Sequence, residues 1–152
     1  MIIGVLSFLI GLIAFLFFVY PRLSVLPGES LDLHTPFQTP FIVKNDGYWP
    51  LMDVNYDLTI EKMETINGCK LINCGVSGIA TKIPKLRINE SSTIYINRAV
   101  GAPADHIKYV ELYINVKYRP YLIPITFTEN KRFKTNRKTN GDYVWFSFHS
   151  EK

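Results

Sequence analysis

The first twenty residues of this 152-residue chain place the strongest constraint on how it can fold. Ile2–Tyr20 carries no charged side chain, and only Gly4, Ser7 and Gly11 fall outside the apolar set. All 17 lysines and arginines and all 13 aspartates and glutamates follow this stretch. As a helix, the stretch would be about 28 Å long, close to the hydrocarbon thickness of a bilayer. The sequence therefore predicts an N-terminal transmembrane helix rather than one plain water-soluble globule.

A cleaved signal peptide is the main alternative for this stretch. Such a peptide has a basic start, a shorter apolar region and a cleavage site between small residues. Here Met1 alone precedes the apolar run, and Val19–Arg22 offers no such site. Tyr20 suits the lipid–water interface, and Pro21 ends the helix. We therefore expect an uncleaved signal anchor over residues 1–21, embedded in the lipid bilayer through Ile2–Tyr20.

Few charged residues flank this anchor, so the sequence offers little to decide on which side of the membrane the C-terminal domain lies. Arg22 is the basic residue next to the helix, and taken literally it favours a C-terminal domain inside the cytoplasm. Long domains, however, cross the membrane largely regardless of their charge. We expect a single-pass membrane protein whose C-terminal domain, residues 22–152, lies outside the cytoplasm.

The rest of the chain shows a period of two instead of a helical period. In Met52–Glu61 every second residue is apolar, which is typical of a half-buried strand. Asn45-Asp46-Gly47 and Asn140-Gly141 are expected to supply the positive-φ positions of hairpin turns. About seven short strands with no helices between them predict an all-β, antiparallel β-sandwich over residues 22–152. The other expected strands are Leu23–Leu26, Phe37–Val43, Ile79–Ile88, Thr93–Asn97, His106–Tyr118, Ile123–Thr128 and Tyr143–Phe148.

Several phrases of the sequence resemble those of known sandwich domains. The run Phe41–Gly47, followed by Leu51–Ile60, resembles a phrase of immunoglobulin-like and fibronectin-like domains, in which Asn-x-Gly lies between two central strands. Leu86–Ile96 is similar to a later phrase of the same families. The resemblance implies an immunoglobulin-like sandwich and points to no reaction. The chain as a whole resembles small uncharacterised bacterial single-pass membrane proteins, through Pro21–Val25, Thr39–Asn45, Val116–Pro120 and Gly141–Trp145.

Cys69 and Cys74 are the candidates for a disulfide bond. Five positions apart on one strand, they would point to opposite faces, so a bond needs a turn that brings the Cα atoms within about 7 Å. An oxidising compartment would permit the bond, and two unpaired thiols are the alternative. No second Cys or His pair accompanies them in the sequence, so we expect no metal site.

A basic cluster precedes the Asn140-Gly141 turn. It consists of Lys131, Arg132, Lys134, Arg137 and Lys138. One interpretation is a patch for an anionic ligand, such as a lipid headgroup or a cell-wall polymer. We favour the other, a charged hairpin tip or a basic edge strand that resists aggregation. Phe133 is the one aromatic residue within the cluster, so the stacking platform of a single-strand binder is lacking and no nucleic acid is expected as a partner.

Two further groups of residues allow both a functional and a structural interpretation. Asp53, Asp57 and Glu61 share one strand face at spacings of about 6.6 Å, and we expect a solvated face rather than a cation site. Tyr118 and Tyr121 are candidates for an exposed recognition patch, although packing in the core and at the edges is the interpretation that we favour.

The sequence contains no motif of an enzyme. It has no G-x-S-x-G elbow, no phosphate-binding glycine loop and no dinucleotide fingerprint, so we expect neither catalysis nor a cofactor. We expect a membrane-anchored, non-catalytic module that presents a surface or an edge strand to another protein of the cell envelope. The alternative is a membrane-tethered module that binds an anionic ligand through the Lys131–Lys138 cluster.

Overall fold

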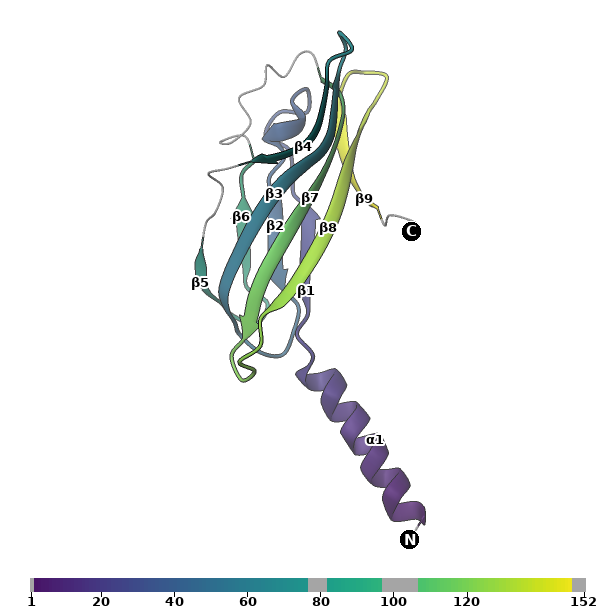
Figure 1. Ribbon diagram of the computed structural model, residues 1–152, viewed down its shortest axis with the longest axis vertical. Helices are drawn as coiled ribbons and strands as arrows, with labels where there is room; N and C mark the ends of the chain where they lie inside the picture. Colours follow the sequence, from purple (N-terminus) through teal and green to yellow (C-terminus); the bar gives the residue numbers. More distant parts are fainter. Residues whose placement is uncertain (1, 77–81, 97–106, 149–152) are drawn as a thin grey trace.

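The computed structural model describes residues 2–76, 82–96 and 107–148. Within its N-terminal helix, the side chains of residues 4, 5, 7–12, 14 and 15 are described. One helix leads into a domain built of two β-sheets, and Figure 1 shows the helix projecting away from the sheets. The expected strands Ile79–Ile88, Thr93–Asn97 and His106–Tyr118 lie partly outside the described residues.

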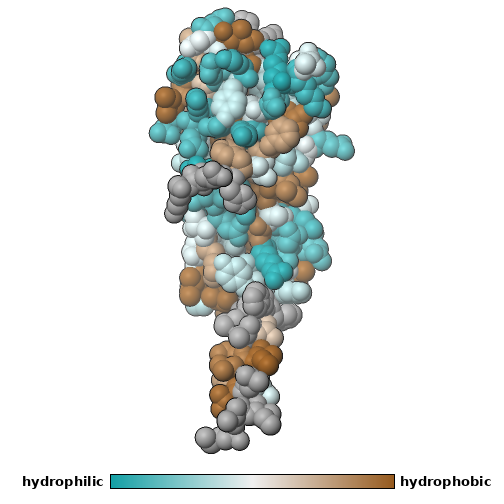
Figure 2. Space-filling model, turned by 90° about the vertical axis from the view of Figure 1, so that its right-hand side faces the viewer, coloured by the Kyte–Doolittle hydropathy of each residue, from teal (hydrophilic) through white to brown (hydrophobic). Residues whose placement is uncertain are grey.

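The helix, α1, spans Ile2–Val19, as the sequence predicts. The large apolar side chains that are described on it are exposed, among them Phe8 at 69%, Ile10 at 61% and Phe15 at 60%. Figure 2 shows this hydrophobic surface below a mostly hydrophilic β-domain. Over the part of the chain that the structure describes, no helix is both long and apolar enough to cross a membrane, so the predicted transmembrane span is not supported.

The two sheets form an all-β, sandwich-like fold, and every strand pairing is antiparallel. The three-stranded sheet has the order β1-β2-β6, with β1 at Leu23–Pro27, β2 at Phe41–Asn45 and β6 at Ser91–Ile94. The six-stranded sheet has the order β4-β3-β7-β8-β9, and β5 also pairs with β3. Its strands are β3 Leu51–Thr65, β4 Lys70–Val76, β5 Ile83–Leu86, β7 Ile107–Pro120, β8 Phe127–Arg137 and β9 Tyr143–Phe148. The described residues thus form nine strands rather than about seven, and a short 3-10 helix, η1, covers Pro36–Gln38.

The alternating pattern of β3 places one face of the strand in the core. Tyr56, Leu58 and Ile60 are buried, whereas Asp57 between them is exposed. The alternation breaks at Asp53, which has a φ of 51° and lies in a register shift against β7. A bulge of this kind reverses the side-chain alternation, so the pattern predicted over Met52–Glu61 holds only beyond it.

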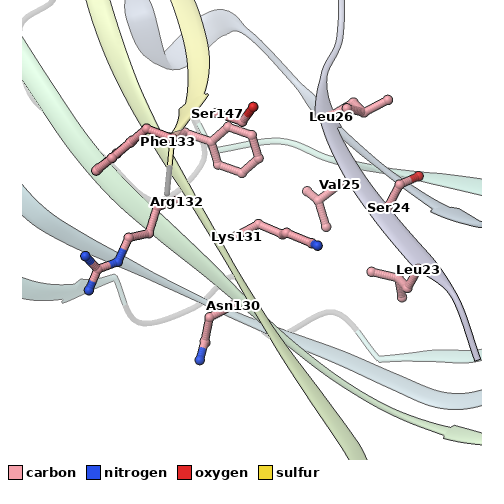
Figure 3. Close-up of a pocket in the computed structure, with 10 residues that line it drawn as sticks. Leu23, Ser24, Val25, Leu26, Asn130, Lys131, Arg132, Phe133 and Ser147 are labelled. Carbon is pink, nitrogen blue, oxygen red and sulfur yellow. The ribbon is translucent and has the colours of Figure 1, made fainter. Parts of the chain in front are cut away.

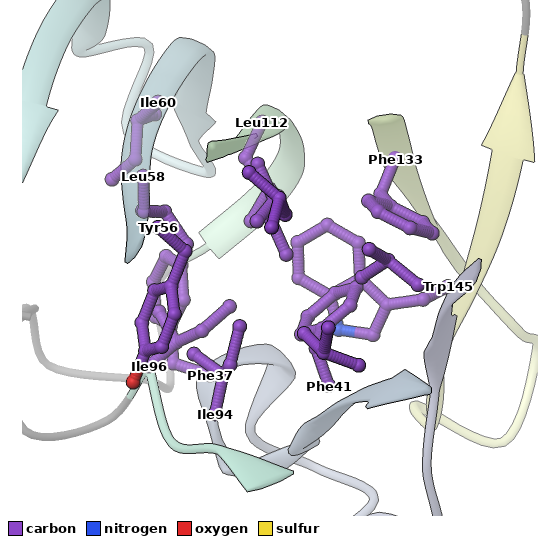
Figure 4. Close-up of a cluster of buried hydrophobic side chains, with 14 of the residues drawn as sticks. Phe37, Phe41, Tyr56, Leu58, Ile60, Ile94, Ile96, Leu112, Phe133 and Trp145 are labelled. Carbon is purple, nitrogen blue, oxygen red and sulfur yellow. The ribbon is translucent and has the colours of Figure 1, made fainter. Parts of the chain in front are cut away.

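Aromatic side chains fill the centre of the sandwich (Figure 4). The Phe41 ring lies 4.7 Å from that of Phe133 and 5.5 Å from that of Trp145, centroid to centroid, and both contacts are edge-on. The Trp145 indole N–H donates to the carbonyl of Pro36 at 2.8 Å, which ties η1 to the six-stranded sheet. Burying each such ring contributes about 1.5–3 kcal/mol, so this cluster holds the two layers together.

Two expected strands begin later than the sequence predicts, and both shifts trace to proline. Residues 37 and 38 belong to η1, and β2 begins at Phe41 after Pro40. The Ile123–Thr128 strand was placed too early, because the chain before β8 contains Pro124 and the strand starts at Phe127. As a result most of the basic cluster lies on β8, with Arg132–Arg137 between β7 and β9, whereas Lys131 lies on the part of β8 that pairs with β7 only among the described residues and Lys138 lies in the turn to β9.

Asn45 has a different role from the one the turn motif predicts. Neither Asn45 nor Gly47 has a positive φ, whereas Gly141 has one of 91°, as expected. Asn45 is fully buried, and its amide donates to the carbonyls of Trp49, Leu86 and Arg87 at 2.8–3.2 Å. Its side-chain carbonyl accepts the Gly47 N–H at 3.0 Å. The Asn-x-Gly motif therefore joins β2 to the loop after β5 through one satisfied buried amide.

Candidate functional site

A groove opens on one side of the sandwich, between β1 and the strands β8 and β9 (Figure 3). Its cavity volume is about 480 Å³, and its lining is mainly apolar, with a few polar side chains. It exists because β1 belongs to one sheet and β8 and β9 to the other, and the two layers diverge here. The lining residues are Leu23, Ser24, Val25, Leu26, Asn130, Lys131, Arg132, Phe133, Ser147 and Phe148.

One wall of the groove is an unpaired strand edge. β1 pairs with β2 alone. Arg22 and Gly28, which flank β1, both bond to the β2 side: the Gly28 N–H donates to Pro40 O, and the Asp46 N–H donates to Arg22 O. Because backbone groups alternate in direction along an antiparallel strand, the even-numbered residues between them, Ser24 and Leu26, also direct their N–H and C=O groups towards β2. The backbone N–H and C=O groups of Leu23 and Val25 therefore point the other way, and no backbone partner is present for them among the described residues. Their side chains are 5% and 4% exposed, so this edge is well ordered by the core.

The opposite wall contains a second unpaired edge, in the first half of β8. From Arg132 onwards β8 lies between β7 and β9, because Arg132 pairs with Phe148 and Arg137 with Tyr143. Over residues 127–131 it pairs with β7 only, within the described part of the chain. Among the described residues, the space beside this half of β8 is thus bounded by backbone without a neighbouring strand on that side.

Lys131 extends its ammonium group into this space (Figure 3). Its Nζ lies 3.0 Å from Oε2 of Glu129. The other oxygen of that carboxylate accepts the Tyr118 hydroxyl at 2.8 Å. Burial, and then the hydrogen bond to Glu129, raise the pKa of the Tyr118 phenol well above its ordinary value, so Tyr118 remains a donor. Both Glu129 oxygens are therefore engaged, and they hold Lys131 towards β1.

The structure divides the predicted basic cluster among three places. Lys131 and Arg132 both contribute atoms to the lining of the groove. The side chains of Arg132 and Lys134, however, follow the opposite alternation of β8. The Arg132 guanidinium lies 3.5 Å from Glu61, and Lys134 lies over the Phe148 ring at 5.3 Å. The structure therefore does not bring the five basic residues onto one surface. Arg137 ends β8, and Lys138 follows in the hairpin turn.

The two predicted recognition tyrosines are also separated. Tyr118 is 2% exposed and stacks on Phe127 at 6.0 Å between ring centroids, so it belongs to the core. Tyr121 is 63% exposed in the turn that follows β7, with the Lys85 ammonium 6.0 Å from its ring. The packing interpretation is right for Tyr118, and Tyr121 by itself forms no patch with it.

Neither the cysteines nor the acidic row forms a metal site in the described residues, which contain no group of three suitable ligands. Cys69 and Cys74 are both free, the first exposed and the second half-buried. Asp53 pairs with Lys82 at 3.0 Å and with Arg119 at 3.1 Å. The pKa of Asp53 is lowered below its ordinary value, and the largest cause is the hydrogen bond from Lys82.

The outer face of the six-stranded sheet carries a second, shallower hollow. Its volume is about 350 Å³, and it is lined by Tyr113, Asn115, Asn130 and Arg132. Asn115 Oδ1 beside it is buried and has no hydrogen-bond partner among the described residues.

Comparisons with known proteins give no relative from which a role could be transferred. No protein-family model matches the chain, and neither a curated protein nor a solved structure matches it significantly. The site is therefore argued from geometry alone. Sequence reasoning singled out Lys131 but not Leu23 and Val25 as site residues, because an unpaired strand edge leaves no mark on the sequence of the strand itself.

Proposed function

We propose that this protein is a membrane-tethered, non-catalytic interaction module. Its apolar helix α1 holds the β-domain at a lipid bilayer, and the domain, outside the cytoplasm, binds another protein of the cell envelope. The observation that carries the proposal is the pairing of an uncharged, predominantly apolar and exposed helix with a domain in which the described residues leave a strand edge unpaired. Tethering raises the local concentration of a partner, so modest contacts are sufficient.

The exposure of α1 supports its association with lipid. A helix that is apolar all round needs an apolar environment on every side, unlike the amphipathic helix of a soluble domain. Val5, Phe8, Ile10 and Phe15 are each more than half exposed. With no charged residue in Ile2–Tyr20, insertion carries no cost of burying charge.

The junction between α1 and the β-domain supports a fixed, close attachment. Only three residues separate Val19 from Leu23. The Tyr20 ring lies edge-on to Phe127 at 6.2 Å, and Arg22 O already accepts the Asp46 N–H. The bottom of the domain in Figure 1, where the β7–β8 turn exposes Tyr121, Leu122 and Ile125, therefore faces the bilayer.

The strand order supports an immunoglobulin-like classification of the domain. In immunoglobulin-type sandwiches, strands A, B, E and D form one sheet and strands C, F and G form the other, and the three-stranded sheet here has the order of A, B and E. In chain order, β1-β2-β6 correspond to the first set and β3-β7-β8 to the second. Such domains serve many binding roles, so this classification fits an interaction module without naming a partner.

Fractionation of the full chain in cells tests the membrane part of the proposal. We expect the protein in the membrane fraction after alkaline carbonate washing. Leu9→Arg combined with Leu12→Arg should release it, because each buried charge costs about 2.5–3.5 kcal/mol in a bilayer. The matched control is Leu31→Arg with Leu33→Arg, since both side chains are at least half exposed on the β-domain. Wild-type protein that is soluble, or a control that is released equally, would overturn the membrane tether.

The native thiol of Cys69 tests the orientation of the domain. It is exposed, so a membrane-impermeant maleimide added to intact cells should label it if the domain lies outside the cytoplasm. Cys74→Ser should retain the labelling, and Cys69→Ser should reduce it. Labelling that requires permeabilised cells would place the domain inside. A disulfide between the two cysteines would instead abolish labelling until a reductant is added.

A further inference from the structure

We propose that the groove between β1 and the first half of β8 binds an extended segment of a partner protein by strand addition, with an aspartate or glutamate of that segment on Lys131. The inference rests on the proposed function and deepens it: it places the interaction site and defines the chemistry of the ligand. Three observations carry it, namely the free backbone of β1, the shape of the groove and the position of one ammonium group.

The backbone of β1 offers the hydrogen bonds that an added strand needs. Leu23 and Val25 each direct one N–H and one C=O away from β2. Each bond formed there contributes about 0.5–1.5 kcal/mol net, because water is displaced from both partners. The buried side chains of Leu23 and Val25 hold this edge in a strand conformation before any ligand arrives. A partner therefore meets a preorganised template and not a flexible loop.

The lining of the groove suits an added strand, and β1 offers it five residues to pair with. A strand of five residues is about 17 Å long and lies about 4.8 Å from its neighbour. Its side chains alternate, and one set would point inwards to Val25 and Phe133, whose atoms line the cavity of about 480 Å³. Apolar side chains at alternate positions of the ligand would fill this cavity.

The ammonium of Lys131 specifies a carboxylate in the ligand. Glu129 is the ion-pair partner of Lys131 among the described residues, and it accepts one of the three ammonium protons. The Tyr118 hydroxyl occupies the other oxygen of Glu129, so the carboxylate cannot shift to cover Lys131 more fully. The Lys131 nitrogen points towards β1 in Figure 3, where a ligand strand would lie. A carboxylate on that strand would make charge-assisted bonds at the edge of an apolar groove.

A second copy of the chain fits this edge less well than a different protein does. Two identical edge strands related by a two-fold axis pair antiparallel. Because α1 ends only three residues before β1, an antiparallel β1–β1 pair would direct the two helices to opposite ends of the dimer. Both helices could not then enter one bilayer. A segment of another protein carries no such constraint.

Peptide selection on the full chain in detergent micelles tests the proposal. The probe is a phage-displayed library of random dodecapeptides, presented to the chain held through a tag ahead of Met1. We expect enrichment of sequences with alternating apolar residues and one aspartate or glutamate. A synthetic peptide of the leading sequence is then titrated by fluorescence polarisation, together with an analogue whose carboxylate is replaced by its amide.

Lys131→Met and Lys134→Met form the matched pair of variants, because both lysines lie on β8 and only Lys131 lines the groove. We expect Lys131→Met to weaken peptide binding about tenfold or more, and Lys134→Met to change it less than about twofold. The amide analogue should bind about as weakly to wild-type protein, and Lys131→Met should not weaken it further. Amide exchange at Leu23 and Val25 should slow when the peptide binds.

Three results would overturn the inference: no enriched peptide, equal affinity for the two lysine variants, or unchanged exchange at Leu23 and Val25. Dimers in sedimentation experiments that compete with the peptide would make a second copy the occupant. The membrane tether is judged separately by the Leu9→Arg and Leu12→Arg fractionation. If the chain binds the peptide but is not held in the membrane fraction, the membrane tether is refuted and the groove proposal stands. If the chain is held in the membrane fraction but binds no peptide, the groove proposal alone is refuted.

Discussion

The two halves of β8 share one strand and one neighbour, β7, yet they have different roles. Residues 132–137 also pair with β9, and there Phe133 and Thr135 are buried in the core. Residues 127–131 lack that second neighbour within the described chain, and there Glu129 and Lys131 replace apolar residues on the same strand face. The comparison teaches that the fully buried inward-facing positions, Phe133 and Thr135, are uncharged, whereas the partly buried ones, Glu129 and Lys131, carry charge. Where the layers diverge, the same positions can carry charge and remain available to a ligand.

The largest effect that separates the halves is expected from Phe133→Ala. Phe133 is fully buried against Phe41, so its truncation leaves a cavity and should cost about 3–5 kcal/mol in the free energy of unfolding. Urea denaturation monitored by circular dichroism measures it. The neighbouring, exposed Lys134→Ala should change the free energy by less than about 0.5 kcal/mol. Equal costs at the two positions would contradict the placement of Phe133 in the core.

The next largest effect concerns a hydrogen bond made by residues 132–137, the half of β8 that pairs with both β7 and β9. The hydroxyl of Thr135 accepts the Val110 N–H at 2.9 Å, in place of a strand–strand bond. Thr135→Val keeps the shape but leaves that buried N–H unpaired, at a cost of about 1–3 kcal/mol. Thr135→Ser retains the hydroxyl and should be the more stable variant in the same denaturation experiment. If valine proves as stable as serine, the bond is not needed.

The stability contributed by residues 127–131 of β8 should depend on alkaline pH, because Tyr118 of the neighbouring strand β7 donates its hydroxyl proton to Glu129. Burial and Glu129 raise the pKa of its phenol above the ordinary value, so the folded chain keeps this proton after the unfolded chain has lost it. The unfolded state then binds fewer protons, and stability must fall as the pH rises above about 10. Thermal unfolding between neutral pH and pH 11 should therefore show a shallower decline for Tyr118→Phe than for wild-type protein. Parallel curves would mean that Tyr118 titrates normally.

The smallest effect is expected for Lys131→Met. The side chains of Lys131 and Glu129 are 40% and 26% exposed, and a pair of this kind contributes at most about 1 kcal/mol. We expect the midpoint of thermal unfolding to stay within a few degrees of the wild-type value, as it should for Lys134→Met. A large loss of stability in Lys131→Met alone would show that Lys131 stabilises the fold, and that residues 127–131 of β8 are not simply available to a ligand.

The sequence predicts the fold well where one strand face is buried along its length. The alternation in β3 and β7 is clear because the opposite sheet covers Leu58, Ile60 and Leu112 without interruption. It fails for β4, whose residues are almost all exposed, and for the start of β8, where Glu129 and Lys131 are only partly buried. In both places the backbone pairs as a strand while no side chain is fully buried, so no hydrophobic pattern marks them.

The sequence alone determined an apolar N-terminal helix and an antiparallel all-β domain, because hydropathy and period depend only on the order of residues along the chain. It also identified Lys131, as one of five clustered basic residues. Only the tertiary structure decided that the ammonium of Lys131 lies apart from the charged groups of Arg132 and Lys134, and that it faces the free edge of β1. The physical reason is that neighbouring side chains on a strand point to opposite faces. Which face opens to a groove depends on how two sheets formed by distant segments diverge.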